Sequence, residues 1–424
     1  MEYIADLHLH SRFSQACSKD LTIQNLEKWS KIKGINLLGT SDFTHPEWIK
    51  ELKRNLIHKN DKDGIFQTIS GFNFVLSSEI SLVYTQGKRG RRIHHCLLAP
   101  SFEVVEQITE YLLKHGRVDY DGRPIFKITS PDFVYNLKQI SKDIEIIPAH
   151  IWTPWFSLFG SKSGFDSVKE CFKDQTKHIH AMETGLSSDP PMNWRLSQLD
   201  KYTLISNSDS HSYWPWRLGR EANLFNFKNL TYKNLIKAIR EKEGFNGTIE
   251  VDPNYGKYHI DGHRKCNFCS MPKQTKQLKG ICPICKKPLV LGVLGRIEEL
   301  ADRPEGYIPE NPTPFKNLLP LSELLSIHLG KATSTKGVWA LYNKFVNNER
   351  SEFDVLLKMP EQEINKIEPQ LAPIIMKNRY GQIKVSPGYD GEYGVPEIDE
   401  EKYKEKQKIL SIKYKNVQTS LGNF

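Results

Sequence analysis

Long hydrophobic runs are missing from this chain of 424 residues. No stretch approaches the roughly 18 consecutive apolar residues that a membrane-spanning helix requires, so no membrane partner is expected. The first residues, MEYIADLHLHSRF, also lack the basic region and the apolar run of an export signal. These absences predict a cytoplasmic protein.

Cysteine is scarce, with seven residues in the whole chain, and its arrangement argues against disulfides. Four of the seven form two C-x2-C pairs, Cys266 with Cys269 and Cys282 with Cys285, separated by twelve residues. Such pairs in a chain without an export signal favour reduced thiols and a metal ion. The spacing predicts a zinc ribbon in which these four cysteines hold one structural zinc ion.

No strong excess of charge of either sign is present. The 59 Lys and Arg residues against 50 Asp and Glu give a formal net charge of +9, which favours a polyanionic partner without deciding the matter. A hydrophobic content of 38% and a charged content of 26% describe a globular protein. The length predicts more than one domain.

Residues 1–245 are expected to form an α/β catalytic domain. Short apolar runs alternate there with amphipathic stretches at intervals of roughly thirty residues, which is the pattern of βα units. The seven strand candidates are 3–10, 35–43, 72–80, 92–99, 144–150, 178–184 and 202–211. Because seven strands are fewer than the usual eight, a distorted (β/α) barrel is predicted, with its site at the carboxyl ends of the strands.

Two smaller units are expected to follow this domain. Glycine, lysine and the paired cysteines mark a zinc-ribbon domain at residues 246–298. Five prolines within residues 301–320 mark a linker. Short amphipathic helix patterns beyond it predict that residues 299–424 comprise this linker and a mainly helical C-terminal domain.

Histidine and acidic residues recur at the ends of the strand candidates. His8 and His10 alternate with leucines, so both side chains project to one face of a strand, and Asp209 and His211 repeat this spacing. The candidate metal ligands and catalytic residues are His8, His10, Asp20, His45, Glu79, His94, His150, Asp209 and His211. Catalytic sites use about three protein ligands per ion, so this set would hold about two to three divalent ions.

The mixture of imidazole and carboxylate ligands favours zinc, with manganese or magnesium as alternatives. A carboxylate such as Glu79 could bridge two ions. Two further candidates stay open at this point. Strand alternation alone does not choose between His94 and its neighbour His95, and Glu183 is either a ligand or the partner in a salt bridge.

Cations and aromatic rings near these positions suit a nucleic acid. A run of cations directly precedes the strand that carries His94, although a charged hairpin tip would have the same sequence. Trp194 follows the loop after Glu183, where its ring could stack an unpaired base or pack the rim of the barrel. The candidate DNA-binding residues are Lys88, Arg89, Arg91, Arg92, Trp194 and Arg195.

The order of these motifs resembles the polymerase and histidinol phosphatase (PHP) family of metallohydrolases, from D-x-H-x-H at residues 6–10 to D-x-H at 209–211. That family has a distorted seven-stranded barrel with a trinuclear metal centre and hydrolyses phosphoesters. Its second motif places Asp and His side by side, whereas Phe43 and Thr44 separate Asp42 from His45 here. Asp42 is therefore either a ligand or an outer partner, and His45 is preferred as the ligand.

Within this family the chain resembles the endonuclease Q branch through segments such as ADLHLHSRFS, GTSDFTHPEW, PAHIWTPW and METGLSSDP, over nearly all residues before about 400. The resemblance implies a metal-dependent DNA repair endonuclease. It implies hydrolysis of the phosphodiester on the 5′ side of deaminated bases (hypoxanthine, uracil or xanthine) and of abasic sites, in double- or single-stranded DNA. The alternatives are a PHP-type phosphatase for a small phosphomonoester and a non-catalytic DNA-binding protein.

Overall fold

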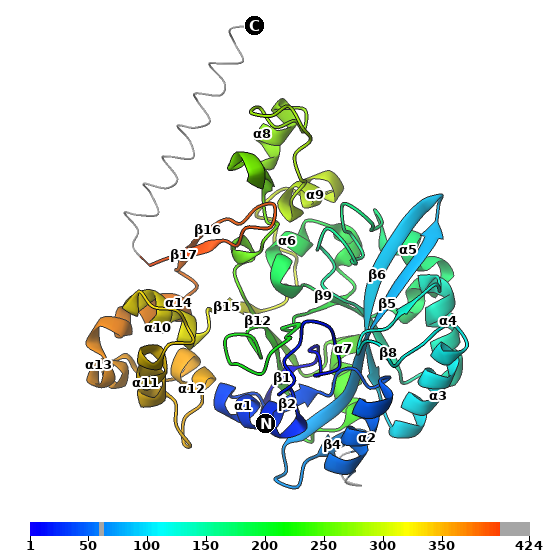
Figure 1. The fold of residues 1–424 in the computed structure, drawn as a ribbon, viewed down its shortest axis with the longest axis horizontal. Helices are drawn as coiled ribbons and strands as arrows, with labels where there is room; N and C mark the ends of the chain where they lie inside the picture. The colour runs from blue at the N-terminus through cyan, green and yellow to red at the C-terminus, as the bar shows by residue number, and fades with distance from the viewer. Residues whose placement is uncertain (59–62, 399–424) are drawn as a thin grey trace, which may run out of the picture.

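A mixed sheet of eleven strands occupies the centre of the molecule (Figure 1). The computed structural model describes residues 1–58 and 63–398. The main path of the sheet runs through β15 (Phe315–Asn317), β12 (Phe245–Glu250), β11 (Ala222–Asn226), β1 (Glu2–Asp6), β2 (Leu37–Gly39), β5 (Asn73–Gln86), β4 (Ile65–Gln67) and β3 (Ile57–His58). Three more strands complete it, namely β6 (Arg89–Ala99), β7 (Ile125–Phe126) and β8 (Glu145–Pro148).

Only part of this sheet follows the expected parallel pattern. Strands β1, β2 and β5 are parallel, but β6 pairs antiparallel with both β5 and β8. The cause is the connection between β5 and β6, where Gly87 and Lys88 both have a φ of 60° and form a two-residue hairpin turn. A turn of this length leaves no room for a crossover helix. The predicted strands of this part thus belong to a larger, mixed sheet.

The last two strands expected for the first domain form a separate parallel pair, β9 (Ala181–Glu183) and β10 (Thr203–Ile205). Backbone hydrogen bonds join this pair to its neighbours, from Ile151 N to Glu183 O and from Asp209 N to His8 O, both at 3.0 Å. One buried apolar core contains Ile65 of β4, Phe225 of β11 and a side chain from each of seven further strands. These side chains are Ala5, Leu37, Val75, Cys96, Ile147, Ala181 and Ile205.

Helices cover the outside of these strands, with α3, α4 and α5 together along one side (Figure 1). The helices of this part are α1 (Ile23–Lys33), α2 (Pro46–Asn55), α3 (Phe102–Leu113), α4 (Ser130–Ile140), α5 (Val168–Phe172), α6 (Pro190–Trp194) and α7 (Tyr232–Glu241). Short 3-10 turns are η2 (Lys173–His178), η3 (Gly185–Ser187) and η4 (Ser197–Leu199). None of the helices in the described residues is long and apolar enough to cross a membrane.

The central sheet continues past residue 245. Strand β12 continues to Glu250 because it pairs with β11, and β15, from the predicted linker, pairs with β12. The cysteine-containing module that follows has few regular elements. They are η5 (Pro253–Tyr255), β13 (Asp261–His263), η6 (Arg264–Cys266), β14 (Phe268–Ser270), α8 (Pro272–Gln277) and α9 (Val293–Leu300).

The helical domain lies on the side of α1, and the hairpin of β16 (Lys384–Ser386) and β17 (Val395–Glu397) lies between this domain and the cysteine module (Figure 1). The elements of the helical domain are α10 (Leu321–Leu329), α11 (Lys336–Phe345), α12 (Glu352–Leu357), α13 (Glu361–Ile367), η7 (Pro369–Leu371) and α14 (Ala372–Arg379). These helices enclose their own apolar core. The end of the predicted domain, residues 399–424, lies outside the described residues.

Candidate metal centre

Six of the predicted ligands come together. They lie within β5 and β6 and just after β1, β8 and β10. Their possible ligand atoms form two groups, and within each group these atoms lie within 4.8 Å of one another. The first group is His8, His10, Glu79 and Asp209, and the second is Glu79, His94 and His150. Glu79 therefore belongs to both groups.

The carboxylate of Glu79 divides its two oxygens between the groups. Its Oε1 lies 2.7 Å from His94 Nδ1 and 3.1 Å from His150 Nε2. Its Oε2 lies 3.2 Å from His10 Nε2 and 3.5 Å from His8 Nε2. Glu79 is fully buried. This is the arrangement expected of a carboxylate that bridges two metal ions.

One buried polar atom of the centre makes no hydrogen bond, which is consistent with a role as a metal ligand. His8 Nε2 is buried and has no hydrogen-bond partner in the described part of the chain. It faces two carboxylates, with Asp209 Oδ1 at 3.7 Å as well as Glu79, and Asp209 Oδ1 lies 3.0 Å from His10 Nε2. A buried ring nitrogen without a partner is costly unless a ligand such as a metal ion completes it.

Two further carboxylates orient the histidine rings from behind. Glu183 lies 3.0 Å from His8 Nδ1, and it accepts hydrogen bonds from the backbone N–H of His150 and from Asn207. Asp42 lies 3.3 Å from His10 Nδ1. Such contacts fix which ring nitrogen is turned toward a metal. Glu183 also lies in a third group of possible ligand atoms with His8 and Cys96, so the choice between ligand and outer partner stays a prediction for both Asp42 and Glu183.

The charges of this centre are strongly coupled. Burial works to lower the pKa of His10, but hydrogen bonds to Asp209, Asp42 and Glu79 outweigh it and raise the pKa well above its usual value. For Glu79 burial works to raise the pKa, but the charges of His94, His8 and Arg123 hold the pKa well below its usual value. The buried carboxylates thus require positive charge, which protons or bound cations can supply.

Backbone strain is concentrated around the same point. Asp42, His150 and Asp209 have positive φ values of 42°, 29° and 47°. Non-glycine residues in this region cost on the order of 1 kcal/mol or more each and are characteristic of functional sites. Gly122 approaches so closely that a Cβ there would lie 2.2 Å from Asp42 Oδ2. The fold therefore holds these carboxylates and rings in positions that the local sequence alone would not favour.

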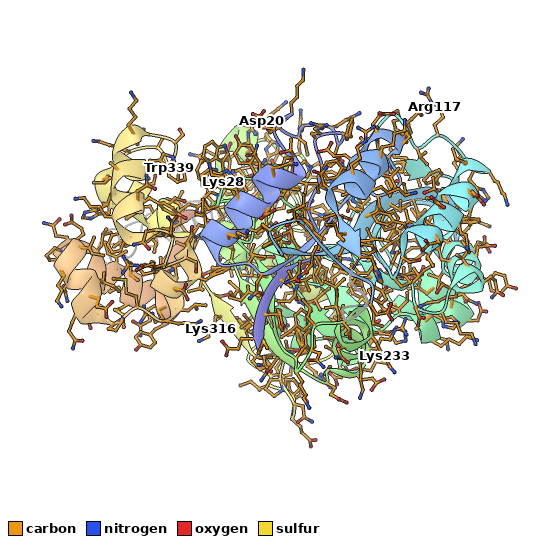
Figure 2. All side chains as sticks on the ribbon, turned by 90° about the horizontal axis from the view of Figure 1, so that it is seen from below. Asp20, Lys28, Arg117, Lys233, Lys316 and Trp339 are labelled. Carbon is orange, nitrogen blue, oxygen red and sulfur yellow. The ribbon has the colours of Figure 1, made fainter. Side chains whose placement is uncertain are left out.

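Three predicted ligands lie outside both groups. Asp20 is exposed at the surface just before α1, because it belongs to a loop and not to a strand end (Figure 2). His45 precedes α2 and stacks on Phe13, with ring centres 4.3 Å apart. His211 is nearer, with its ring centre 4.5 Å from that of His10, and its Nδ1 lies 3.0 Å from the carbonyl oxygen of Asp209.

His95 also lies outside both groups, so of the two adjacent histidines it is His94 that faces the other possible ligands. Successive side chains of a strand point to opposite faces, so His95 points away from the face of His94. Its Nε2 lies 3.1 Å from Ser130 Oγ, and its ring stacks on Phe133. His95 is a core residue.

Arg123 is a functional candidate that the sequence reading missed. Its guanidinium NH1 donates to Glu79 Oε2 at 3.2 Å, and its side chain is 27% exposed. A partly exposed cation beside a metal-binding carboxylate is well placed to contact a phosphate oxygen. Arg123 lies in the irregular loop DYDGRP between α3 and β7, where no periodicity or motif marks it.

The predicted DNA-binding residues separate into two kinds. Arg91 is buried, pairs with Glu170 at 2.9 Å and stacks 3.9 Å over the ring of Phe165. Arg195 is buried and pairs with Glu298 of α9 at 2.6 Å. In both, the buried guanidinium is already paired with a carboxylate of the same chain. Lys88, Arg89 and Arg92 are exposed on the β5–β6 hairpin.

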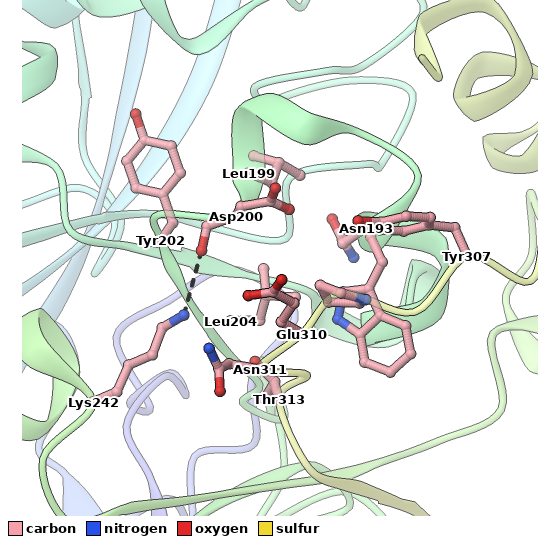
Figure 3. Close-up of a pocket in the computed structure, with 12 residues that line it drawn as sticks. Asn193, Leu199, Asp200, Tyr202, Leu204, Lys242, Tyr307, Glu310, Asn311 and Thr313 are labelled. Carbon is pink, nitrogen blue, oxygen red and sulfur yellow. Dashed lines mark hydrogen bonds between the residues drawn. The ribbon is translucent and has the colours of Figure 1, made fainter. Parts of the chain in front are cut away.

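Trp194 lines a cavity of about 550 Å³, and none of the residues of the metal centre lines it. Figure 3 shows this cavity with Asp200, Tyr202 and Lys242 around it. Tyr202 and Leu204, at the start of β10, line the same cavity, whereas Asp209 follows the other end of that strand. Lys242 closes one side, with its Nζ 3.4 Å from the carbonyl oxygen of Asp200. Trp194 therefore does not lie beside the metal ligands, where its ring could have stacked an unpaired base.

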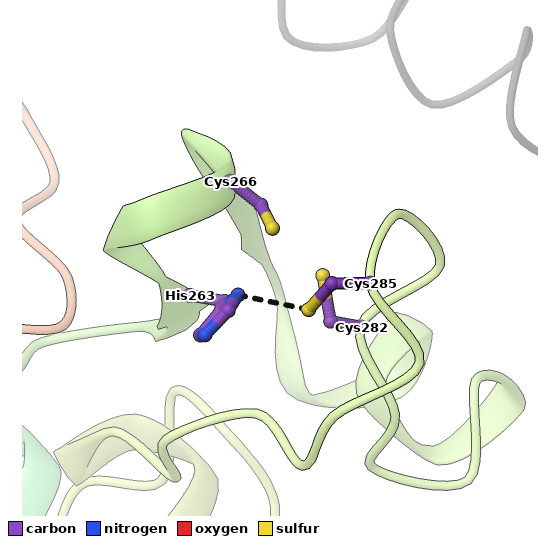
Figure 4. A group of neighbouring side chains, drawn as sticks. All are labelled: His263, Cys266, Cys282 and Cys285. Carbon is purple, nitrogen blue, oxygen red and sulfur yellow. Dashed lines mark hydrogen bonds between the residues drawn. The ribbon is translucent and has the colours of Figure 1, made fainter.

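The cysteine module holds a further group of possible ligands. His263, Cys266, Cys282 and Cys285 lie together, with all ligand atoms within 4.8 Å of one another (Figure 4). The group includes a histidine that the sequence reading did not consider. It does not include Cys269, the remaining cysteine of the predicted set.

Comparison with known proteins agrees with this arrangement. A family model described as the MJ0043 C-terminal domain matches residues 320–382, which is the helical domain. The crystal structure of the lesion-specific endonuclease PfuEndoQ from Pyrococcus furiosus is 33% identical, with a TM-score of 0.84 over 94% of this chain and 96% of that chain. A structure of an endonuclease Q complex with a 27-mer duplex carrying an abasic lesion is also 33% identical, with a TM-score of 0.83 over 95% and 98%.

A relative of unknown function covers part of the chain. The uncharacterized protein MJ0043 of Methanocaldococcus jannaschii is 33% identical over 293 residues, which are 67% of this chain. The aligned part is 35% of that protein, so this chain spans only about a third of its length.

The mixed α/β fold and the buried histidine–carboxylate centre define a metal-dependent phosphoesterase of the nuclease class. The sequence identity to two solved endonuclease Q structures is above 30% over almost their full length, which shows the family of this chain. It belongs to the endonuclease Q family. The resemblance inferred from the sequence motifs is confirmed.

Proposed function

We propose that this protein is a DNA repair endonuclease that hydrolyses the phosphodiester on the 5′ side of a deaminated base (hypoxanthine, uracil or xanthine) or of an abasic site. The observation that carries the proposal is the Glu79-centred pair of metal-binding groups, assembled in a chain that spans 96% of a lesion-specific endonuclease. The related complex with an abasic duplex supports damaged DNA as the substrate class.

We further infer that β1, β2, β5, β6, β8, β9 and β10 enclose a distorted (β/α) barrel. The shared core of one side chain from each strand supports this inference. In such a barrel the strand ends that precede His10, His150 and Asp209 open on one face, and Glu79 of β5 lies beside these residues.

The centre would hold two to three divalent ions, with zinc favoured by the number of imidazoles. Bound ions supply Lewis acidity, which activates water and stabilises negative charge at phosphorus. Glu183 and Asp42 hold the rings of His8 and His10 in place for this purpose. Arg123 provides a cation for a phosphate oxygen next to Glu79.

A cationic groove beside this centre supports a polymeric substrate. Arg92, Lys127, Lys162 and Trp155 line a cavity of about 770 Å³ along the β5–β6 hairpin. Four cations line it. Arg91 pairs with Glu170, whereas Arg92, Lys127 and Lys162 form no ion pair with another residue in 1–58 or 63–398. Unpaired cations in a groove fit the phosphates of a nucleic acid strand, whereas a small phosphomonoester would not need them.

Phe156 connects this groove to the metal-binding groups. The guanidinium of Arg92 lies 5.7 Å from the centre of the Phe156 ring, and that ring lies 4.7 Å from the ring of His94. Phe156 has a φ of 60°, another strained position beside the centre. Trp155, whose side chain is 39% exposed, offers a flat face next to the groove for an unstacked base.

The proposal is tested with labelled duplexes that carry deoxyinosine, deoxyuridine, an abasic site or no lesion. We expect metal-dependent nicks directly 5′ of each lesion, no nick in the undamaged duplex and no activity in an Asp209→Ala, His211→Ala variant. Turnover of a small phosphomonoester without any nicking would assign the centre to a phosphatase instead.

Neutralising the groove should weaken DNA binding without disabling the chemistry. For the triple variant Arg92→Ala, Lys127→Ala, Lys162→Ala we expect KM to rise about 10- to 100-fold with kcat little changed. The slope of log KM against log salt should fall by up to about 2 to 3, because each lost phosphate contact removes roughly one released counterion. Steady-state nicking at several salt concentrations measures both quantities.

A matched triple variant controls for the loss of net charge. Lys177, Lys201 and Lys233 are exposed and lie toward the opposite ends of the strands from the metal centre. Their replacement by alanine should leave KM and its salt dependence nearly unchanged. Equal effects of the two triple variants would show that net charge, and not the groove, determines affinity.

A further inference from the structure

We infer that two buried asparagines position the metal centre by fixing how Glu183 meets His8. They are Asn207, which follows β10, and Asn223, in β11. Neither is among the candidate ligands. The inference rests on the proposed metal centre but on no particular substrate, and it assigns Glu183 as the outer partner of His8.

Asn223 is a polar residue in an apolar position. It lies in the sequence ANLF of β11 and is fully buried. In the antiparallel ladder with β1 it is opposite Ala5, so both side chains project to the same face. Ala5 and Phe225 of that face belong to the apolar core. An amide at such a position is costly unless hydrogen bonds complete it, so its partners are informative.

Main-chain groups fix the orientation of the Asn223 amide. The N–H of Ser206 donates to Asn223 Oδ1 at 3.0 Å, and Asn223 Nδ2 donates to the carbonyl oxygens of Ser206 and Ala5 at 2.8 and 3.3 Å. Because a main-chain N–H only donates and a carbonyl only accepts, the reversed amide would place like groups against one another. Asn223 Nδ2 is therefore the group that faces Asn207, and it donates to Asn207 Oδ1 at 2.8 Å.

The same reasoning orients Asn207, which is 2% exposed. The N–H of Leu7 donates to Asn207 Oδ1 at 2.8 Å, so this oxygen accepts from both Leu7 and Asn223. Its Nδ2 is then turned toward Glu183 and donates to Oε1 at 2.9 Å. Two main-chain N–H groups, on Ser206 and Leu7, thus determine that Glu183 meets a donor here.

Glu183 receives a second donor on its other oxygen. The N–H of His150 donates to Oε2 at 2.8 Å. His8 Nδ1 faces both oxygens, at 3.1 Å from Oε1 and 3.0 Å from Oε2. A carboxylate that accepts on both oxygens requires a hydrogen on His8 Nδ1, and in a neutral ring Nε2 then keeps its lone pair. His8 Nε2 is the nitrogen turned toward Glu79 and Asp209.

The amide pair therefore selects the ring nitrogen that a metal ion would meet. Contacts behind a histidine ligand fix its tautomer and its orientation, and their loss typically weakens metal binding by about 10- to 100-fold. The alternative is an ion held by His8 Nδ1, Glu183 and Cys96, whose ligand atoms also lie together. The two arrangements use opposite nitrogens of one ring, so they can be told apart.

Full-length protein loaded with ¹¹³Cd and labelled with ¹⁵N in its histidines tests this on the unmodified chain. The signals of His8 are assigned by their loss from a His8→Asn variant. We expect cadmium to couple to Nε2 of His8 while Nδ1 carries a hydrogen. Coupling of cadmium to Nδ1 would overturn the inference.

Variants test the role of the amides through metal affinity. Asn207→Asp keeps an oxygen for Leu7 and Asn223 but turns a second oxygen, and no donor, toward Glu183. Competition with a chromophoric chelator should show zinc binding weakened by about 10- to 100-fold. Asn223→Asp should weaken it less, because Asn223 acts through Asn207.

Asn378 of α14 provides a matched control. It is 2% exposed, accepts from the N–H of Leu319 at 2.8 Å and donates to the carbonyl oxygen of Leu319 at 3.0 Å. Asn378→Asp should lower Tm and leave zinc affinity unchanged. Unchanged zinc affinity in folded Asn207→Asp, or an equal loss in Asn378→Asp, would refute the role of the amide pair. Because these experiments follow metal binding, an absence of lesion-specific nicking would count against the proposed function alone.

Discussion

Glu79→Gln is expected to lower the rate of strand cleavage by about 1000-fold or more and to remove metal from both ligand groups. The two oxygens of this buried carboxylate face separate groups, and the nearest contact is 2.7 Å, to His94 Nδ1. The change keeps the shape of the side chain but replaces one oxygen with an amide nitrogen, which does not bind these metals. Single-turnover nicking and the metal content of the purified protein measure the two effects.

The neighbouring histidines give a matched control for this prediction. His94→Asn should cause a similar loss, whereas His95→Asn should retain metal and activity, because His95 contacts Ser130 on the opposite face of the same strand. Circular dichroism verifies that each variant is folded. If Glu79→Gln retained both its metal and its cleavage rate, the centre would have to lie elsewhere.

The part of the site that lies on strands could be predicted from the sequence. Strand alternation places His8 and His10 on one face without any knowledge of the fold. Glu79, His150 and Asp209 were identifiable because each lies at or beyond the end of an apolar run, and such ends meet in α/β folds. The structure brings all five of these side chains together.

The part that depends on loops could not be predicted in this way. Asp20 and Arg123 lie in irregular segments, so no periodicity indicates the direction of either side chain. The chain path takes Asp20 to the surface and Arg123 to Glu79. The same limit applies to Arg91 and Arg195, since their partners Glu170 and Glu298 are distant in the sequence.

The fold shows a similar division. The apolar runs predicted strands, but their periodicity does not reveal direction, which the two-residue turn at Gly87 and Lys88 determines. The cysteine spacing predicted a metal-binding module, but His263 is found only when β13 is paired with β14. Pairing between strands is long-range information that a single pattern does not contain.

Lys33→Met is expected to lower the free energy of unfolding by about 3 to 5 kcal/mol. Lys33 ends α1 but is only 1% exposed, and its Nζ donates to Glu352 Oε1 of the helical domain and to the carbonyl oxygen of Pro215, both at 2.7 Å. Glu352 is fully buried and also accepts hydrogen bonds from Leu321 N and Tyr342 Oη. The variant leaves this carboxylate buried without its cation. Urea denaturation followed by tryptophan fluorescence measures the loss.

An exposed lysine of the same helix provides the control. Lys31 pairs with Glu27 at 2.6 Å, but its side chain is 49% exposed, so Lys31→Met should change stability by less than about 1 kcal/mol. Adding Glu352→Met to Lys33→Met should recover much of the loss, because no unpaired charge then stays buried. A loss below about 1 kcal/mol in Lys33→Met would contradict the prediction. Because Pro215 follows the loop of Asp209 and His211, the same contact links the helical domain to the metal centre.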